Sequence, residues 1–261
     1  INSVTSLYLR KNFTIIDTSE ITGSKTILKV TQNGKTFLWE PFSARYAGSY
    51  NIERNLYKSK FGNKIQFEEF NHDLGVVFRY KWAFSDAYGF VKYSELESTS
   101  ERSAQIEVLD GLQNLLPTGV NSGLQESRST LVDAYKKNEL VPETGLGVFS
   151  LSAMIVDKAE PSEALSATTV WSKGLSNPNY LLSSLQLDGY RRGEQIEPEE
   201  FTKATKAAFF IHANFSLESK KKQEWFTVAE VNQSSAEVIN LNHHISTGEN
   251  LFEIINKDVA L

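Results

Sequence analysis

The chain has 261 residues, no cysteine, and a net charge of −5 from 27 basic and 32 acidic side chains. The missing cysteines exclude a disulfide framework, thiolate metal ligands and a cysteine nucleophile. The mild acidity argues against nucleic acid as a partner, and no apolar run of roughly 18 residues is present to span a membrane. A chain of this length buries roughly 75% of its unfolded surface, so it can build a core without crosslinks.

Alternation of apolar and polar residues dominates the first half of the chain and predicts antiparallel strands, the first at residues 6–10. Asn33 and Gly34 both tolerate a positive φ, so they predict a tight hairpin between strands at residues 26–30 and 36–39. Further strands are expected at residues 64–70, 76–84, 90–93, 104–109, 147–156, 167–171, 207–217 and 224–231.

Helical spacing replaces this alternation in two places. Leu124, Leu131 and Tyr135 fit one face of a helix over residues 124–135, and from Ser234 onward the pattern again favours helices. Without a linker or an internal repeat, the predicted organisation is one β domain over residues 1–233 and a helical extension over residues 234–261.

The sequence predicts neither a metal site nor a cofactor. The histidines His72, His212, His243 and His244 show no H-x-x-x-H spacing, which two zinc ligands on one helix face require. The Gly145–Gly147 pair precedes a strand, whereas a dinucleotide fingerprint follows one.

Polar side chains cluster directly after the strand predicted at residues 104–109. Asp110, Gln113 and Asn114 precede a turn marked by Pro117. Such groups at a strand end suit either the anchoring of a loop or hydrogen bonds to sugar hydroxyls. Trp82 can stack on a sugar ring or fill the core. The candidate carbohydrate-binding residues are therefore Asp110, Gln113, Asn114 and Trp82.

Four strings between residues 60 and 175 carry a family resemblance: FVKYSELES, IEVLDGLQNLLPTGV, LVDAYKKNELV and LGVFSLSAMIVDKAEPSEAL. This region resembles the N-terminal part of cellobiose-phosphorylase-like proteins of the glycoside hydrolase and phosphorylase group. The resemblance implies a mainly β fold, a large antiparallel β-supersandwich like that of galactose mutarotase, with a few helices and a helical C-terminal tail. In that family the tail leads into an (α/α)6 barrel that holds the catalytic residues, so no catalytic residue is carried over.

Two functions follow from these observations. The first is a non-catalytic N-terminal domain of a carbohydrate-active enzyme, which supports the active-site edge, inter-domain contacts or a dimer. Its expected partners are carbohydrate, a C-terminal catalytic domain of the same polypeptide and a second copy. The start at Ile1 rather than methionine, and the end among helices, lead us to expect a processed or trimmed chain. Its compartment is left open between bacterial cytoplasm and periplasm.

The second is a free-standing sugar-binding or aldose-epimerase-like protein of the same fold. An epimerase needs an acid and a base on either side of the reacting carbon. His72 or His212 would supply the acid, and Glu69 or Glu230 the base. A scaffold or adhesin sandwich without a ligand is the third reading.

Overall fold

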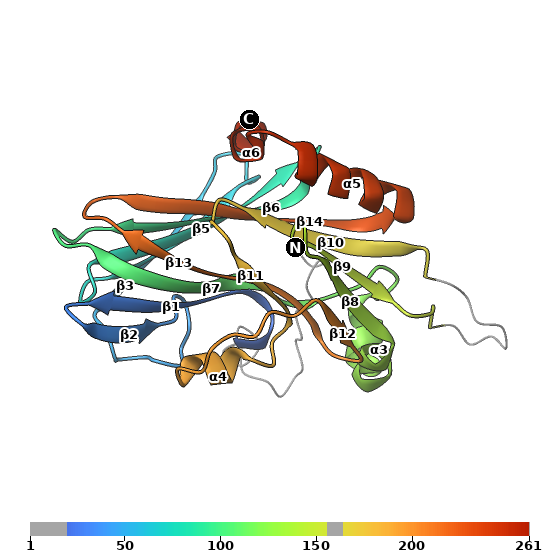
Figure 1. Ribbon diagram of the computed structural model, residues 1–261, viewed down its shortest axis with the longest axis horizontal. Helices are drawn as coiled ribbons and strands as arrows, with labels where there is room; N and C mark the ends of the chain where they lie inside the picture. The colour runs from blue at the N-terminus through green and yellow to red at the C-terminus, as the bar shows by residue number, and fades with distance from the viewer. Residues whose placement is uncertain (1–19, 156–163, 261) are drawn as a thin grey trace.

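Strands dominate the structure, a computed structural model that describes residues 20–155 and 164–260 (Figure 1). They are β1 (Gly23–Gln32), β2 (Lys35–Trp39), β3 (Ile52–Lys58), β4 (Ile65–Asn71), β5 (Val76–Ser85), β6 (Gly89–Ser98), β7 (Ala104–Leu115), β8 (Lys136–Val141), β9 (Leu146–Leu151), β10 (Ser166–Lys173), β11 (Asn179–Ser183), β12 (Phe201–Lys203), β13 (Ala207–Leu217) and β14 (Lys222–Ser234). The helices are α2 (Ser122–Ser127), α3 (Ser129–Tyr135), α4 (Leu187–Arg191), α5 (Ser235–Thr247) and α6 (Leu251–Ala260).

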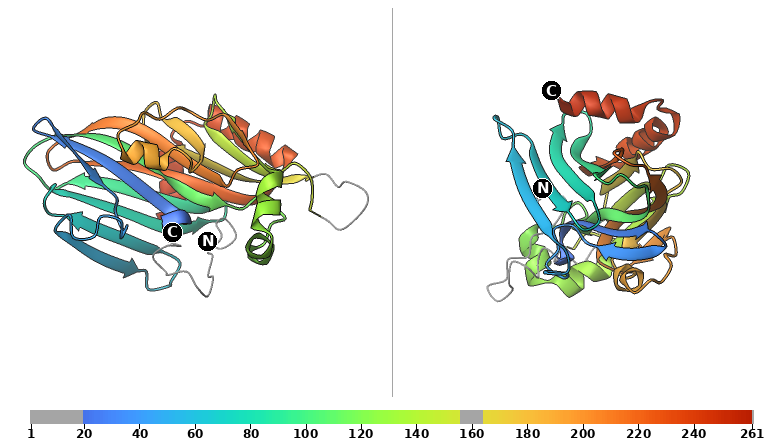
Figure 2. Two further views of the ribbon diagram at one scale, coloured as in Figure 1. Left: turned by 90° about the horizontal axis from the view of Figure 1, so that it is seen from below. Right: turned by 90° about the vertical axis from the view of Figure 1, so that its left-hand side faces the viewer.

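These strands form two antiparallel sheets that pack face to face (Figures 1 and 2). The smaller sheet has the order β11-β13-β7-β1-β2, and the larger has the order β12-β8-β9-β10-β14-β6-β5-β4-β3. Apolar side chains from both sheets meet in one core cluster, which includes Val108 and Phe209 from the smaller sheet and Phe78 and Trp225 from the larger. The predicted mainly β sandwich is confirmed. The strand predicted at residues 6–10 lies outside the described residues.

The hairpin predicted around Asn33 and Gly34 is present between β1 and β2. Both residues have a positive φ, 51° and 74°, and the flanking residues Gln32 and Lys35 pair across the strands. Two consecutive left-handed residues match the right-handed twist of a hairpin, and asparagine and glycine adopt them at little cost.

The strand predicted to end at residue 109 continues to Leu115, so its predicted end was wrong, and Asp110, Gln113 and Asn114 belong to the strand. β7 lies inside its sheet, paired with β1 on one side and β13 on the other. Because both of its faces are covered, its sequence lacks a simple alternation that would mark its length. Asn114, with a φ of 54°, lies where the register with β13 shifts, which is a bulge.

The single helix predicted over residues 124–135 is two short helices, α2 and α3, separated at Arg128, which has a φ of −137°. The Ser127 hydroxyl donates to the Gly123 carbonyl at 2.8 Å. Such bonds compete with continuation of a helix.

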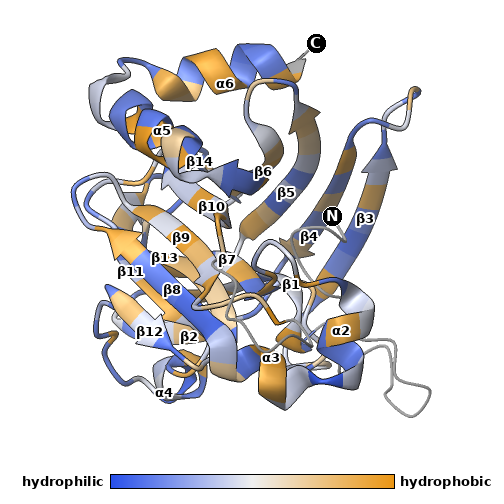
Figure 3. Ribbon diagram, turned by 90° about the vertical axis from the view of Figure 1, so that its right-hand side faces the viewer, coloured by the Kyte–Doolittle hydropathy of each residue, from blue (hydrophilic) through white to orange (hydrophobic). Residues whose placement is uncertain are grey.

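The C-terminal tail is helical, as predicted, and α5 and α6 cover part of the outer face of the larger sheet (Figure 1). Ser234 begins α5 with a capping box, in which Ser234 and Glu237 bond each other's backbone N–H. Apolar residues of α6 alternate with polar ones along the helix (Figure 3). Its buried residues Leu251, Ile255 and Val259 pack against a cluster that includes Trp171 and Phe226.

The packing of α6 predicts that truncating two adjacent isoleucines lowers the stability of the fold by different amounts. Ile255 is fully buried, whereas Ile254 is 44% exposed. Ile255→Val should lower the free energy of unfolding by about 1 kcal/mol, because it leaves a methyl-sized gap in the cluster. The same change at Ile254 should cost less than about 0.5 kcal/mol. Urea denaturation of both variants measures the difference, and equal losses would contradict this packing.

Candidate functional site

Asp110 lies at the centre of a polar cluster that joins the two sheets. Its Oδ1 accepts hydrogen bonds from Lys92 Nζ and Thr26 Oγ1, both at 2.6 Å. Its Oδ2 accepts from Trp225 Nε1 at 2.7 Å and from Ser94 Oγ at 3.1 Å. Asp110 and Thr26 belong to the smaller sheet, and the other three residues belong to the larger one.

The side chains of Asp110 and Lys92 have no exposed surface. Burial lowers the pKa of Lys92, and the Asp110 carboxylate opposes this shift by favouring the charged ammonium. Four donors already occupy the Asp110 carboxylate, and a sugar hydroxyl would find none of its atoms at the surface. The geometry therefore supports the anchoring role for Asp110, as a link between sheets and not as the anchor of a loop.

Gln113 and Asn114 hold the segment that precedes β1. Gln113 Nε2 donates to the Glu20 carbonyl at 3.1 Å, and Asn114 Nδ2 donates to Thr22 Oγ1 at 3.2 Å. Both residues are buried, at 2% and 4% exposure. They contact the start of the described chain, a long-range partner that the sequence does not reveal.

Trp82 lies in the main core cluster and is 7% exposed. Of the two roles that the sequence left open, the packing supports the core role. The four candidate residues do not converge on a common surface, and none of them lines the cavity described below.

The two histidines considered for acid–base chemistry have carboxylate partners that the sequence did not single out. His212 Nε2 lies 3.0 Å from Glu107 Oε1, and Tyr190 packs edge-on against the His212 ring. His72 Nε2 lies 3.5 Å from Glu53 Oε2 in an exposed pair.

Glu230 and Glu69, the two carboxylates considered as the base, make other interactions. Glu230 accepts the N–H of its neighbour Val231 at 3.0 Å. Glu69 is buried in the wall of a cavity, where an arginine holds it. No hydrogen bond or ion pair between described residues joins either of them to His72 or His212.

A cavity of about 440 Å³ lies under residues 40–51, the segment that joins β2 to β3. β2 is an edge strand of the smaller sheet and β3 is an edge strand of the larger, so this segment connects the two sheets at their edges. The side chains that line the cavity include Trp39, Glu40, Tyr46, Tyr50, Arg54 and Glu69.

Glu69 is fully engaged at this cavity. Its Oε1 accepts Trp39 Nε1 at 2.9 Å, and its Oε2 accepts the Phe42 N–H at 2.7 Å and Arg54 Nε at 2.6 Å. The Glu69 side chain is 1% exposed, while that of Arg54 is 50% exposed. The carboxylate therefore lies beneath the guanidinium that pairs with it.

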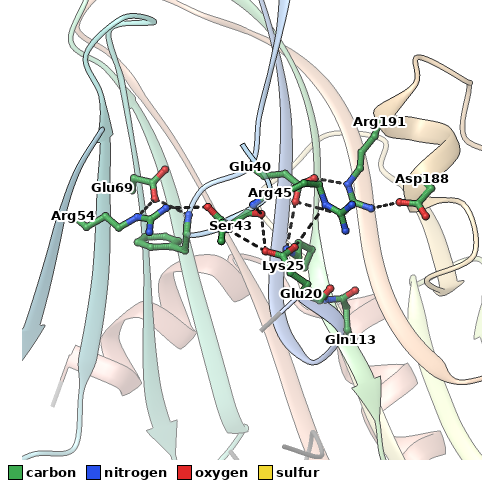
Figure 4. A network of polar contacts seen from close by, with 12 residues as sticks. Glu20, Lys25, Glu40, Ser43, Arg45, Arg54, Glu69, Gln113, Asp188 and Arg191 are labelled. Atoms are coloured by element: carbon green, nitrogen blue, oxygen red, sulfur yellow. Dashed lines mark hydrogen bonds and ion pairs between the residues drawn. The ribbon is translucent and has the colours of Figure 1, made fainter. Parts of the chain in front are cut away.

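Glu40 is the second buried carboxylate of the cavity, with no exposed side-chain surface. Arg191 donates to it through Nε, and through Nη2 at 3.3 Å, while Lys25 Nζ lies 3.4 Å away. Arg191 comes from α4, so Glu40 ties this helix to the cavity wall (Figure 4). Both buried carboxylates are therefore paired with cations inside the protein, Glu69 with Arg54 and Glu40 with Arg191 and Lys25.

Glu20 extends the network behind the cavity. It accepts Lys25 Nζ at 2.6 Å and Ser43 Oγ at 2.7 Å, and so fixes the segment over the cavity (Figure 4). The network of Figure 4 contains four carboxylates and four cations: Glu20, Glu40, Glu69, Asp188, Lys25, Arg45, Arg54 and Arg191.

This network predicts a pH dependence of stability. Burial raises the pKa of Glu20, but hydrogen bonds from Lys25 and Ser43 outweigh it, so the pKa lies below its usual 4.5. A lowered pKa stabilises the fold above the unfolded value of about 4.3, and this contribution is lost as the pH falls through the folded value. Glu20→Gln should therefore reduce the loss of stability between about pH 5 and pH 3.

Urea denaturation at several pH values checks this expectation. Glu126 is exposed on α2, and Glu126→Gln is the matched control, which should keep the wild-type dependence. If Glu20→Gln retained the full acid-induced loss, the ionised form of Glu20 would not be the one that the network stabilises.

Within residues 20–155 and 164–260, no group of three or more histidine, aspartate or glutamate side chains could hold a metal ion. No helix of this part of the chain is long and apolar enough to cross a membrane.

No family model and no characterised relative matches the sequence. Among solved structures, a bacterial glucoamylase in complex with acarbose is similar, with a TM-score of 0.52 and 9% identity over 91% of this chain and 30% of that chain. A polysaccharide lyase has a TM-score of 0.49 and 8% identity over 85% and 28% of the two chains. A protein assigned as a kojibiose phosphorylase, from the human microbiome, has a TM-score of 0.48 and 8% identity over 100% and 31%. The chain thus spans about 30% of the length of these carbohydrate-active enzymes, and at such identities the likeness to the glucoamylase shows a shared fold.

Proposed function

We propose that the chain is the non-catalytic N-terminal β-sandwich domain of a larger carbohydrate-active enzyme of the glycoside phosphorylase or hydrolase type. The observation that carries this proposal is the coverage of the glucoamylase match, 91% of this chain against 30% of the solved chain. The sequence resemblance to cellobiose-phosphorylase-like proteins supports the same assignment. In this proposal residues 1–233 form the domain, and residues 234–261 begin the linker to the catalytic domain.

The state of the carboxylates supports a non-catalytic role. Asp110, Glu40 and Glu69 are buried and paired with cations. Glu107 lies within ion-pair distance of both His212 and Lys29. These residues hold the sandwich together, which suits a domain that supports an active-site edge formed with another domain.

In this proposal the catalytic domain makes contact at exposed apolar side chains near α5. Ile239 on α5 and Leu165 are 68% and 71% exposed, and both line a cavity of about 370 Å³ with Val238. Large apolar side chains gathered around one hollow are typical of a contact surface. We also propose two further partners of the chain, a carbohydrate and a second copy of the chain.

An assay of the longer polypeptide tests the proposal. The full chain should cleave α- or β-linked disaccharides by phosphorolysis or hydrolysis. Ile239→Asp should lower this activity, because it places a charge in the domain contact, whereas Asn240→Asp, at the exposed neighbouring position, should not. A full chain inactive on all such disaccharides would count against the assignment, and an unchanged Ile239→Asp enzyme would overturn the contact.

The alternative function is a free-standing aldose-epimerase-like protein, and one observation favours it: the buried His212 lies 3.0 Å from the carboxylate of Glu107, whose side chain is 31% exposed. Mutarotation of glucose or galactose by the purified chain, abolished in His212→Ala, would support it. A rate that stays unchanged when His72 and His212 are both replaced would eliminate it.

A further inference from the structure

The cavity under residues 40–51 has unused hydrogen-bond donors, although its carboxylates are occupied. Arg54 donates through Nε to Glu69 and through Nη2 to the Ser43 carbonyl at 3.1 Å. Among the described residues, none accepts a hydrogen bond from Nη1. Half of the Arg54 side chain is exposed, so these N–H groups are available to a ligand.

Tyr46 adds a second unused donor to the wall. Its hydroxyl has no hydrogen-bond partner among the described residues, and burial and the neighbouring Glu40 carboxylate raise the pKa of Tyr46, so it stays protonated at neutral pH. Tyr50 differs, because its hydroxyl already donates to the Leu38 carbonyl at 2.7 Å. Both rings line the cavity and supply flat apolar surface.

The charges at the cavity are arranged by depth. Glu40 and Glu69 lie at 0% and 1% exposure, whereas Arg54 is 50% exposed. Arg45, which approaches Glu20 to 3.9 Å, is 41% exposed. Of the three charged side chains that line the cavity, Glu40, Arg54 and Glu69, only that of Arg54 is exposed, so a molecule entering from solvent meets its guanidinium first.

We propose that this cavity binds a carboxylate-bearing ligand, with the carboxylate on the Arg54 guanidinium and the carbon skeleton against Tyr46 and Tyr50. A planar guanidinium matches a carboxylate in both geometry and charge. A cationic ligand would meet Arg54, and a neutral polyol would find the strongest acceptors of the wall, Glu40 and Glu69, already occupied. The volume of about 440 Å³ lies within the range of small-molecule sites.

Two sources share this chemistry: the uronic acid unit of a saccharide and a simple carboxylic acid. The proposal concerns the chain by itself and does not depend on its being part of a larger enzyme. Failure of the binding experiment therefore leaves the proposed domain role unaffected. Failure of the enzyme assay leaves the proposed ligand of the cavity unaffected.

Isothermal titration of the full chain with a matched pair of sugars tests the proposal. Glucuronate and glucose differ only in a carboxylate in place of a hydroxymethyl group, and glucuronate should bind at least about tenfold more tightly. Its affinity should fall as salt is added, because part of it comes from charge. Benzoate is the third probe: affinity equal to that of glucuronate would assign the site to a simple carboxylic acid, and weaker binding would assign it to a uronate.

Two variants locate the binding. Arg54→Gln should reduce glucuronate affinity at least about tenfold, whereas Arg192→Gln, at an exposed arginine paired with Glu194, should leave it unchanged. Ala47→Phe fills the cavity from its rim but keeps the Arg54–Glu69 pair, so it remains informative if Arg54→Gln fails to fold. Equal affinities for glucuronate and glucose, no binding of either, or unchanged binding by Ala47→Phe would overturn the proposal.

Discussion

Replacing Asp110 with alanine should lower the free energy of unfolding by about 3–5 kcal/mol. The change leaves Lys92 without its counter-ion at a position that has no exposed surface. It also removes the acceptor of Trp225 Nε1, which is buried in the larger sheet. A buried charge without a partner and a buried donor without an acceptor each destabilise a fold. Urea denaturation followed by tryptophan fluorescence measures the loss.

A control and a rescue make this test specific. Asp86 is exposed in the turn between β5 and β6, and Asp86→Ala should cost less than about 1 kcal/mol. Replacing the whole pair, Asp110→Leu with Lys92→Met, should recover much of the loss, because no buried charge remains. An Asp110→Ala protein of near wild-type stability that lost affinity for sugars would show that Asp110 is a ligand contact and not a link between sheets.

Gly111→Ala should be destabilising by about 3 kcal/mol, at the upper end of the usual cost of overpacking. A Cβ at this position would overlap the Phe209 carbonyl oxygen and lie 2.8 Å from the Phe210 Cα. These are backbone atoms of the paired strand β13, and they can move only if the two strands separate. Chemical denaturation measures the cost, and hydrogen exchange should show weaker protection along β7 and β13.

Gly123→Ala is the matched control for this replacement. Gly123 lies in α2, where a Cβ would meet only the Asn121 side chain, at 3.5 Å. Alanine is favoured over glycine inside a helix, so this variant should be neutral or stabilised by up to about 1 kcal/mol. If Gly111→Ala were as stable as Gly123→Ala, the close approach of β7 to β13 would be contradicted.

The sequence was informative where local chemistry determines the structure. Asn33 and Gly34 supply the positive φ values of a hairpin turn by themselves, and the strand at residues 207–217 was predicted with the bounds that β13 has. β7 shows the opposite case. Its polar residues Asp110 and Asn114 suggested a loop, because their partners lie on strands distant in sequence.

Four strands at or next to the edges of the sheets were missed for a related reason. β3, β8, β11 and β12 are short or polar, and the hydrophilic colouring of β3 in Figure 3 shows how little apolar signal it carries. Their pairing partners, and not their own composition, make them strands. Single-sequence alternation does not detect such elements.

The cavity could not be predicted from the sequence. Its wall combines Glu40 after β2, Arg54 on β3 and Glu69 on β4, and Arg191 reaches it from α4, about 150 positions away along the chain (Figure 4). One signal was present in the sequence: the stretch from Trp39 to Arg54 is rich in aromatic residues and contains two arginines. The pair of His212 with Glu107 likewise arises from strands that are neighbours only in the folded sheet.

The central claim is that this chain is a non-catalytic sandwich domain. The most direct measurement is turnover by the purified chain of 261 residues, assayed for phosphorolysis and hydrolysis of α- and β-linked disaccharides and for mutarotation of glucose and galactose. We expect rates at the uncatalysed background in all of these assays. Mutarotation well above background that disappears in His212→Ala would contradict it and establish the chain as an enzyme in its own right.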